Sequence, residues 1–197
     1  MKHSFLTLIL VALLHGAALA KEVEIPGIPS SAEQFTEMRD TLATTPEGGA
    51  AATVAALLAF SQSPEVGLQC LTLILDQRNV GNGTVIKGHA PIGSIMYHVN
   101  RISGYNMWPY LGFAYLQGAK AQSNYAVSPP YKIVTSRQKN SGTDSSGQVK
   151  VFVECDGFRP RPISLHRNDK GIWKAYEMSS LFLNVSPPAS SKPVDDL

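Results

Sequence analysis

The chain has 197 residues, 44% of them hydrophobic, and a formal net charge of +2 at pH 7. This length and apolar content are sufficient for one domain with a buried core, and with a net charge so close to neutral we expect no nucleic-acid partner. The charge is uneven, because the first third of the chain after residue 20 is acidic and residues 131–174 are basic. The basic region predicts either an anionic partner or an ordinary solvated surface.

Residues 1–20 have the features of an export signal. Lys2 precedes an apolar run over residues 5–14, and small residues end at Ala20, behind which we expect cleavage. The run is shorter than the roughly 20 apolar residues that span a bilayer, so an uncleaved anchor is the less favoured alternative. We therefore expect an exported protein, periplasmic or secreted, without an integral membrane segment in the mature chain.

Three helices are predicted in the first half of the mature chain, after an extended lead-in over residues 21–29 that contains two prolines. Each helix begins at a Ser or Thr that can cap its N-terminus, and two of these residues are followed by proline at the first helical position. The second helix is apolar almost all round, which predicts a central, buried position. The predicted helices cover residues 31–43, 45–60 and 63–77.

Two short motifs carry a resemblance to a known family. They are TPEGGA at residues 45–50, and RPRPI at residues 159–163 leading to GIWK at residues 171–174. With these motifs the chain resembles a family of uncharacterised bacterial proteins described as a domain of unknown function. The resemblance covers most of the mature chain and implies one domain. It implies no activity, cofactor or catalytic residue.

The middle of the chain, residues 81–124, has the least regular pattern. A short strand is predicted at residues 84–86 and a helix at residues 94–102. Five aromatic residues then follow between Tyr105 and Tyr115. They either line a pocket or an exposed patch, or belong to a loop that packs on the core. We favour the loop, because a long connection in a small domain must bury side chains of its own.

From residue 131 onward, apolar and polar residues alternate in the manner of an antiparallel sheet. The four predicted strands fall within residues 132–137, 149–153, 163–165 and 172–176. We therefore predict an α+β fold, in which about three N-terminal helices pack on one face of a mainly antiparallel sheet of about four strands. Trp173 should lie at that interface. We expect the domain to span residues 21–184, with a disordered tail over residues 185–197.

The two cysteines, Cys70 and Cys155, permit two interpretations. An even number of cysteines in an exported protein suggests a disulfide, which would tie the helical half to the sheet. The alternative is that both are small buried hydrophobic residues, because each lies in an apolar run. The sequence does not distinguish a bridge from two free thiols, because it does not give the distance between the Cα atoms.

No set of residues has the types and spacing of a known catalytic or metal site, so we predict no catalytic residue, metal or cofactor. The histidines His89, His98 and His166 occur singly, without partners at metal-ligand spacing. Residues 83–89 have the glycine spacing of a phosphate-binding loop, but His89 stands where that loop requires lysine. We therefore exclude a nucleotide site there.

Arg159 and Arg161 form the candidate ligand-binding site. The prolines that alternate with them keep the backbone extended, so both guanidinium groups should point to the same side, where they can bind a carboxylate or phosphate. The alternative is that proline and charge protect a sheet edge from aggregation.

Three functional hypotheses follow. The first is a non-enzymatic exported protein that binds a partner protein or an anionic ligand. The second is a small exported enzyme whose site lies between the aromatic middle segment and the sheet and uses His98 or His166. The third is a structural role in the cell envelope, which the sequence does not separate from the first.

Overall fold

A five-stranded antiparallel sheet and four α-helices make up the domain in the computed structural model, which describes residues 20–191. The strands lie in the order β1-β4-β5-β6-β7. Their bounds are β1 Lys21–Ile25, β4 Tyr131–Ser136, β5 Gln148–Cys155, β6 Phe158–Arg167 and β7 Trp173–Glu177. The helices are α1 Ala32–Leu42, α2 Pro46–Ala59, α3 Pro64–Ile74 and α4 Gly93–Gly104, and a separate hairpin pairs β2 Val80–Ile86 with β3 His89–Pro91. The α+β class is thus confirmed.

The three predicted helix starts are confirmed by their caps. The hydroxyl of Ser31 accepts a hydrogen bond from the Gln34 backbone N–H at 3.2 Å. The hydroxyl of Thr45 accepts from Gly48 N–H at 3.1 Å, and Ser63 accepts at the start of α3. Each side chain satisfies a backbone donor that has no partner within the helix.

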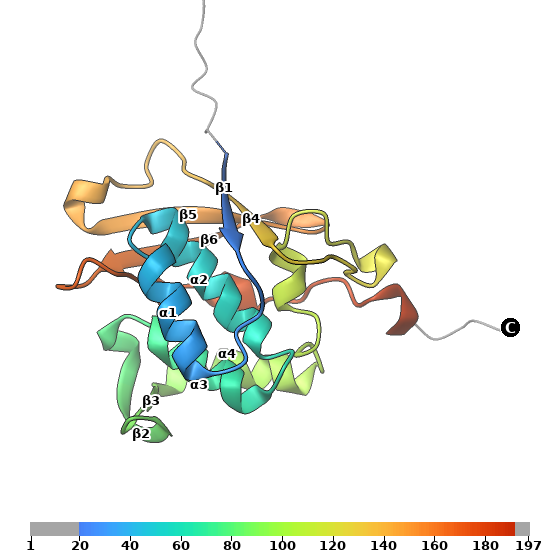
Figure 1. The fold of residues 1–197 in the computed structure, drawn as a ribbon, viewed down its shortest axis with the longest axis horizontal. Coiled ribbons are helices and arrows are strands. Elements are labelled where there is room, and N and C mark those ends of the chain that lie inside the picture. Colours follow the sequence, from blue (N-terminus) through green and yellow to red (C-terminus); the bar gives the residue numbers. More distant parts are fainter. Residues whose placement is uncertain (1–19, 192–197) are drawn as a thin grey trace, which may run out of the picture.

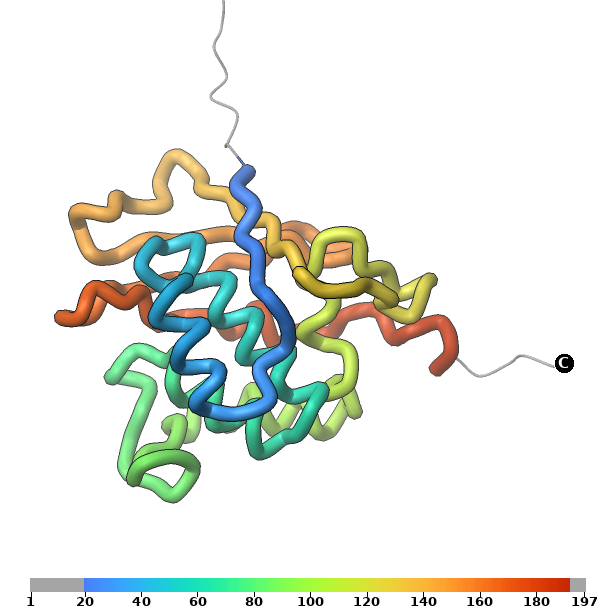
Figure 2. Tube along the Cα trace, in the orientation of Figure 1, coloured from blue at the N-terminus to red at the C-terminus, as the bar shows by residue number. Residues whose placement is uncertain are grey.

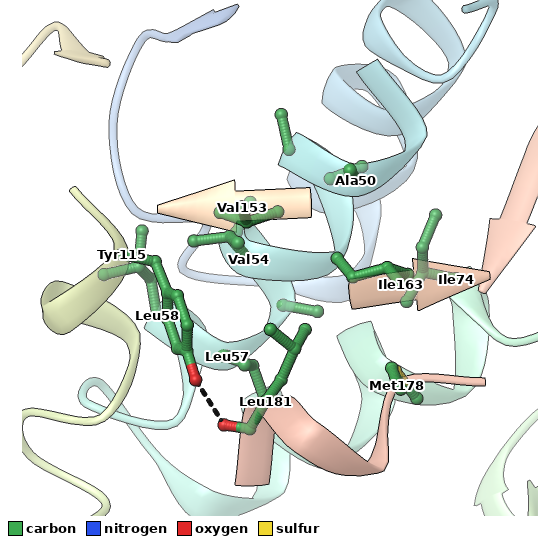
Figure 3. Close-up of a cluster of buried hydrophobic side chains, with 14 of the residues drawn as sticks. Ala50, Val54, Leu57, Leu58, Ile74, Tyr115, Val153, Ile163, Met178 and Leu181 are labelled. Atoms are coloured by element: carbon green, nitrogen blue, oxygen red, sulfur yellow. Dashed lines mark hydrogen bonds between the residues drawn. The ribbon is translucent and has the colours of Figure 1, made fainter. Parts of the chain in front are cut away.

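Helix α2 lies at the centre of the domain, with every one of its residues buried. It contacts all five strands of the sheet and also α1 and α3. Figure 3 shows Val54, Leu57 and Leu58 of α2 in the same apolar cluster as Val153 and Ile163 of the sheet. The prediction of about three helices on a sheet of about four strands is roughly consistent with this arrangement, in which α2 contacts the sheet and α1 and α3 pack against α2. Only a helix that is apolar all round can occupy this enclosed position.

The fifth strand, β1, was not predicted as a strand. It pairs antiparallel with β4 along the edge of the sheet, with Lys21 opposite Thr135 and Ile25 opposite Tyr131, and Figures 1 and 2 show it in blue beside β4. Only Ile25 of its residues is buried. The short sequence KEVEI therefore carries too little apolar alternation to be distinguished from an extended lead-in.

The two family motifs meet between α2 and β7. A Cβ atom added at Gly49 would lie 2.8 Å from both Cβ and the carbonyl oxygen of Trp173. The Trp173 backbone N–H donates to the carbonyl of Ala43 at 2.7 Å, and its side chain is 1% exposed. The prediction that Trp173 lies at the helix–sheet interface is confirmed. A glycine at position 49 allows the helix backbone to approach the strand this closely.

The aromatic middle segment packs on the core, as the favoured interpretation predicted. Trp108 meets Phe60 edge-on, with the ring centroids 5.3 Å apart. Tyr115 is 1% exposed and its hydroxyl donates to the Leu181 carbonyl at 2.7 Å, the dashed line in Figure 3. Tyr105 is the exception, because most of its side chain is exposed.

The predicted domain end at residue 184 is too early. Val185 is buried, the Tyr125 hydroxyl donates to the Ser186 carbonyl at 2.6 Å, and residues 189–191 form a 3₁₀ turn. Residues 185–191 are therefore ordered on the domain, fixed mainly by contacts distant in sequence. The rest of the predicted tail, and residues 1–19 of the predicted export signal, lie outside the described residues.

Candidate functional site

A cleft with a volume of about 640 Å³ lies between two parts of the fold that are distant in sequence. One wall is formed by the C-terminal end of α3, the 3₁₀ turn η1 (Gln77–Asn79) and the β2–β3 hairpin. The other is formed by residues 146–148 and the strands and turn of residues 166–174. Figure 1 shows the green β2–β3 hairpin and the red-orange β6–β7 turn on the same side of the molecule. The volume is in the range of small-molecule sites.

Basic side chains predominate in the lining. Two acidic residues also line the cleft, Asp76 and Asp169, and Asp76 is paired with Arg78 at 2.8 Å. Within residues 20–191, the side chains of Lys87 and Arg167 make no ion pair or hydrogen bond, although hydrogen bonding and, as a smaller cause, the Lys87 charge lower the pKa of Glu33. The basic lining residues are Arg39, Arg78, Lys87, Arg167 and Lys174.

Arg78 and His166 of this lining belong to a stacked cluster with Tyr176. The Arg78 guanidinium lies 4.3 Å from the centroid of the Tyr176 ring, and the His166 ring stacks on Tyr176 with a centroid distance of 4.3 Å. His166 Nδ1 contacts the Arg78 guanidinium and lies 3.4 Å from Asp76 Oδ2. The hydrogen bond to Asp76 raises the pKa of Arg78. Because Asp76 also accepts from the Arg78 backbone N–H at 3.0 Å, the turn and the cluster hold each other in place.

Lys174 of β7 is the most unusual charged group in the cleft. Its ammonium donates to the carbonyl oxygen of Leu73 at the end of α3, and Arg39 of α1 donates to the same oxygen at 3.0 Å. Burial, with the nearby Arg39 charge as the second cause, lowers the pKa of Lys174 to about 8. Two cations therefore share one acceptor, and the pKa of one of them lies well below that of an ordinary lysine.

A model of the family described as a domain of unknown function, DUF6935, matches residues 27–189. The chain belongs to the DUF6935 family. The matched range includes α1 to β7 and both walls of the cleft. Comparison with curated proteins and with solved structures found no match. The family resemblance of the sequence is thereby confirmed for most of the chain, while the chemistry of the DUF6935 domain has to be inferred from its structure.

Arg159 and Arg161 do not point together into a ligand-binding site in the DUF6935 domain. Arg159 is exposed, whereas Arg161 is 6% exposed. Side chains alternate between the two faces of β6, and Arg161 lies on the same buried face as Ile163 and Leu165. The segment after β7 then folds over the Arg161 side chain. Its guanidinium fastens that segment to the sheet through hydrogen bonds to Tyr115 Oη (2.7 Å), Ser180 O (3.2 Å), Leu183 O (3.0 Å) and Asn184 O (2.8 Å).

The disulfide interpretation is wrong, because Cys70 and Cys155 are both free and buried. Cys70 lies in α3 with its sulfur 4.0 Å from the Ser31 carbonyl, whereas Cys155 ends β5 near Tyr115 and Arg161. Burial raises the pKa of the Cys70 thiol to about 12 and also raises that of Cys155. Neither thiol has the low pKa of a nucleophile.

The histidines are separated in the DUF6935 domain. His89 and His166 line the cleft, but His98 of α4 stacks on Phe182 at a centroid distance of 5.6 Å and does not line it. A smaller cavity of about 280 Å³ does lie between residues 114–120 and the sheet, yet neither His98 nor His166 lines it. The predicted enzyme site between the aromatic segment and the sheet therefore lacks its histidine.

Among residues 20–191, no helix has the length and apolar character needed to cross a bilayer, and no group of three potential metal ligands is found.

Sequence reasoning missed Arg39, Asp76 and Lys174 as members of a site. Lys174 belongs to the GIWK motif, which is the one signal that singles it out.

Proposed function

We propose that the DUF6935 domain is a non-enzymatic binding protein that takes a small anionic ligand into the basic cleft. The observation that supports this most directly is the charge of the lining, in which five Lys and Arg residues meet two acidic residues. One of the acidic residues, Asp76, is already neutralised by Arg78. Arg39 is likewise paired with Asp40 at 2.6 Å. An anion entering the cleft would therefore gain charge-assisted hydrogen bonds, without having to displace a carboxylate, from the lining cations that make no ion pair.

Lys87 and Arg167 are the residues that we expect to bind the ligand first. Lys87 stands at the tip of the β2–β3 hairpin and Arg167 at the end of β6, so they belong to opposite walls. The Arg167 guanidinium lies 5.8 Å from the Trp173 ring centroid, so its side chain rests on the buried tryptophan of the GIWK motif. Charges converging from two walls favour a ligand with more than one anionic group.

The test is a calorimetric titration of the protein with inorganic phosphate, pyrophosphate and citrate, with glucose as the neutral comparison. The anions should bind and glucose should not, and the affinity should fall as NaCl is raised. The double variant Lys87→Gln/Arg167→Gln should lose at least about 10-fold in affinity, which corresponds to about 1.4 kcal/mol.

The matched control for this titration is Lys139→Gln/Lys150→Gln. It removes the same charge from exposed residues that do not line the cleft, and it should leave the affinity within about 2-fold of the unaltered protein, because distant exposed charges are screened. Equal losses in both double variants would show that net charge, and not the cleft, binds the anions.

A second candidate is an enzyme that uses His166 as a base. The observation that favours it is the position of Asp76 Oδ2, 3.4 Å from His166 Nδ1, in a cleft that can hold a substrate. This pairing can orient the imidazole. If ³¹P NMR of the pyrophosphate sample shows a product signal that is lost in His166→Asn, the enzyme replaces the binding protein as the better proposal.

We also propose that the protein is exported, supported by the signal-like composition of residues 1–20. The intact mass of the protein from its native host should correspond to a chain beginning at Lys21. A mass that includes residues 1–20 would contradict cleavage at this position.

A further inference from the structure

Lys174 differs from the other cations of the cleft in that the pKa of its amine is lowered, to about 8. Its amine is partly buried against the end of α3 and has Arg39 beside it on the same carbonyl oxygen. A buried site next to a second cation favours the neutral form of an amine. A lysine in such surroundings is the usual form of an amine nucleophile, since only the unprotonated nitrogen has a free electron pair.

The neighbouring cations supply the other half of a reactive site. Arg167 and Lys87 line the same cleft as Lys174 and are available to an anionic group. Consider a small molecule that carries an anionic group, a carboxylate or phosphate, and also a carbonyl group. Arg167 and Lys87 could bind its anionic group while its carbonyl group contacts the Lys174 amine. Because the bound carbonyl group would already lie next to the amine, the two groups would react as parts of one complex and would not have to meet in solution.

We propose that Lys174 condenses reversibly with the aldehyde or keto group of an anionic carbonyl compound, such as a 2-oxo acid, held in the cleft. This inference rests on the proposed anion binding and narrows the class of ligand. The amine electron pair forms a bond to the carbonyl carbon, and the carbonyl π pair moves to oxygen. Two protons pass from nitrogen to this oxygen, which leaves as water when the C=N bond forms. No oxidant or reductant is needed, and hydrolysis reverses the step.

The charged groups that face or surround Lys174 come from every element packed against it. Arg39 disfavours the protonated amine, while Asp40 and Asp76 favour it. His166 is its cross-strand partner on β6, and the β6–β7 turn adds further charge. Burial outweighs the two carboxylates. The groups are Arg39, Asp40, Asp76, His166, Arg167, Asp169 and Lys170.

The test is reductive trapping with glyoxylate and cyanoborohydride, followed by peptide mapping. Hydride from cyanoborohydride adds to the imine carbon and leaves a stable carboxymethyl group on the lysine nitrogen. At pH 7.5, Lys174 should be modified about 10-fold faster than Lys170, because an ordinary lysine amine is almost fully protonated at this pH. The rate at Lys174 should rise with pH and level off above pH 8, where the amine has lost its proton.

Three comparisons keep the inference separate from the proposed function. Glycolaldehyde, the neutral counterpart of glyoxylate, should show a smaller preference for Lys174, because the lowered pKa of the amine still favours it but anion binding no longer does. Inorganic phosphate should slow trapping by glyoxylate. Lys174→Arg keeps the charge but cannot form an imine, so it should show no trapping at this position. If phosphate binds but Lys174 reacts no faster than Lys170, the inference is wrong and anion binding stands. If phosphate does not bind at all, the proposed anion binding is wrong, and the inference that rests on it is wrong as well.

Discussion

Gly48→Ala is expected to lower the free energy of unfolding by about 3 kcal/mol or more, at the upper end for overpacking a core. A Cβ atom at this position would overlap the backbone carbonyl of Leu42, where the chain passes from α1 to α2. Backbone cannot rotate away as a side chain can, so α1 and α2 would have to separate. Because α2 contacts all five strands, the strain would spread into the sheet. Urea unfolding monitored by circular dichroism measures the change.

Gly104→Ala is the matched control for this substitution. Gly104 is the last residue of α4 and is exposed, and a Cβ atom there would meet nothing within 4 Å. Alanine should leave the stability unchanged or raise it by up to about 1 kcal/mol, because it reduces the freedom of the unfolded chain. A loss at Gly48 no larger than about 1 kcal/mol would show that the connection between α1 and α2 is not as close as described.

Arg161→Met is expected to cost about 4 kcal/mol of stability. The substitution keeps much of the side-chain length but removes the donors that serve three backbone carbonyls and the Tyr115 hydroxyl. An orphaned buried acceptor costs about 1–3 kcal/mol, and part of this is recovered where water can enter. The segment after β7 should loosen first, so limited proteolysis after residue 178 should accelerate along with the loss measured in urea.

Arg159→Met removes the same charge two residues earlier in β6. Arg159 is exposed, so its substitution should change the stability by less than about 0.5 kcal/mol. Similar losses in the two variants would mean that the buried hydrogen bonds of Arg161 contribute nothing beyond its charge. The comparison also separates the two residues that the sequence pattern made equivalent.

The helical half of the fold was predictable because its signals are local. Ser31, Thr45 and Ser63 each lie next to the helix that they cap, and the apolar face of each helix repeats within a few residues. The predicted strands from residue 132 onward are likewise local alternations, and each lies within a strand of the sheet or extends beyond it by one residue. Such patterns require no knowledge of distant contacts.

The site was not predictable in the same way, because its residues converge from distant parts of the chain. Arg39 and Lys174 meet at one carbonyl oxygen although more than 130 residues separate them. Their meeting depends on how α3 ends beside β7, where Leu75 bridges to Ala175. The Arg161 prediction failed for the same reason. Its orientation along the strand was predictable, but the segment that covers it was not.

The pairing of β1 with β4 bears on the order in which the domain can form. Lys21 lies opposite Thr135, so this pair closes a loop of more than 100 residues that contains all four helices. Closing so long a loop carries a large entropic cost, although the cost grows only slowly with length. The edge strand therefore has no partner until residues 131–136 have left the ribosome. A chain that crosses a membrane with its N-terminus first would meet the same delay on the far side.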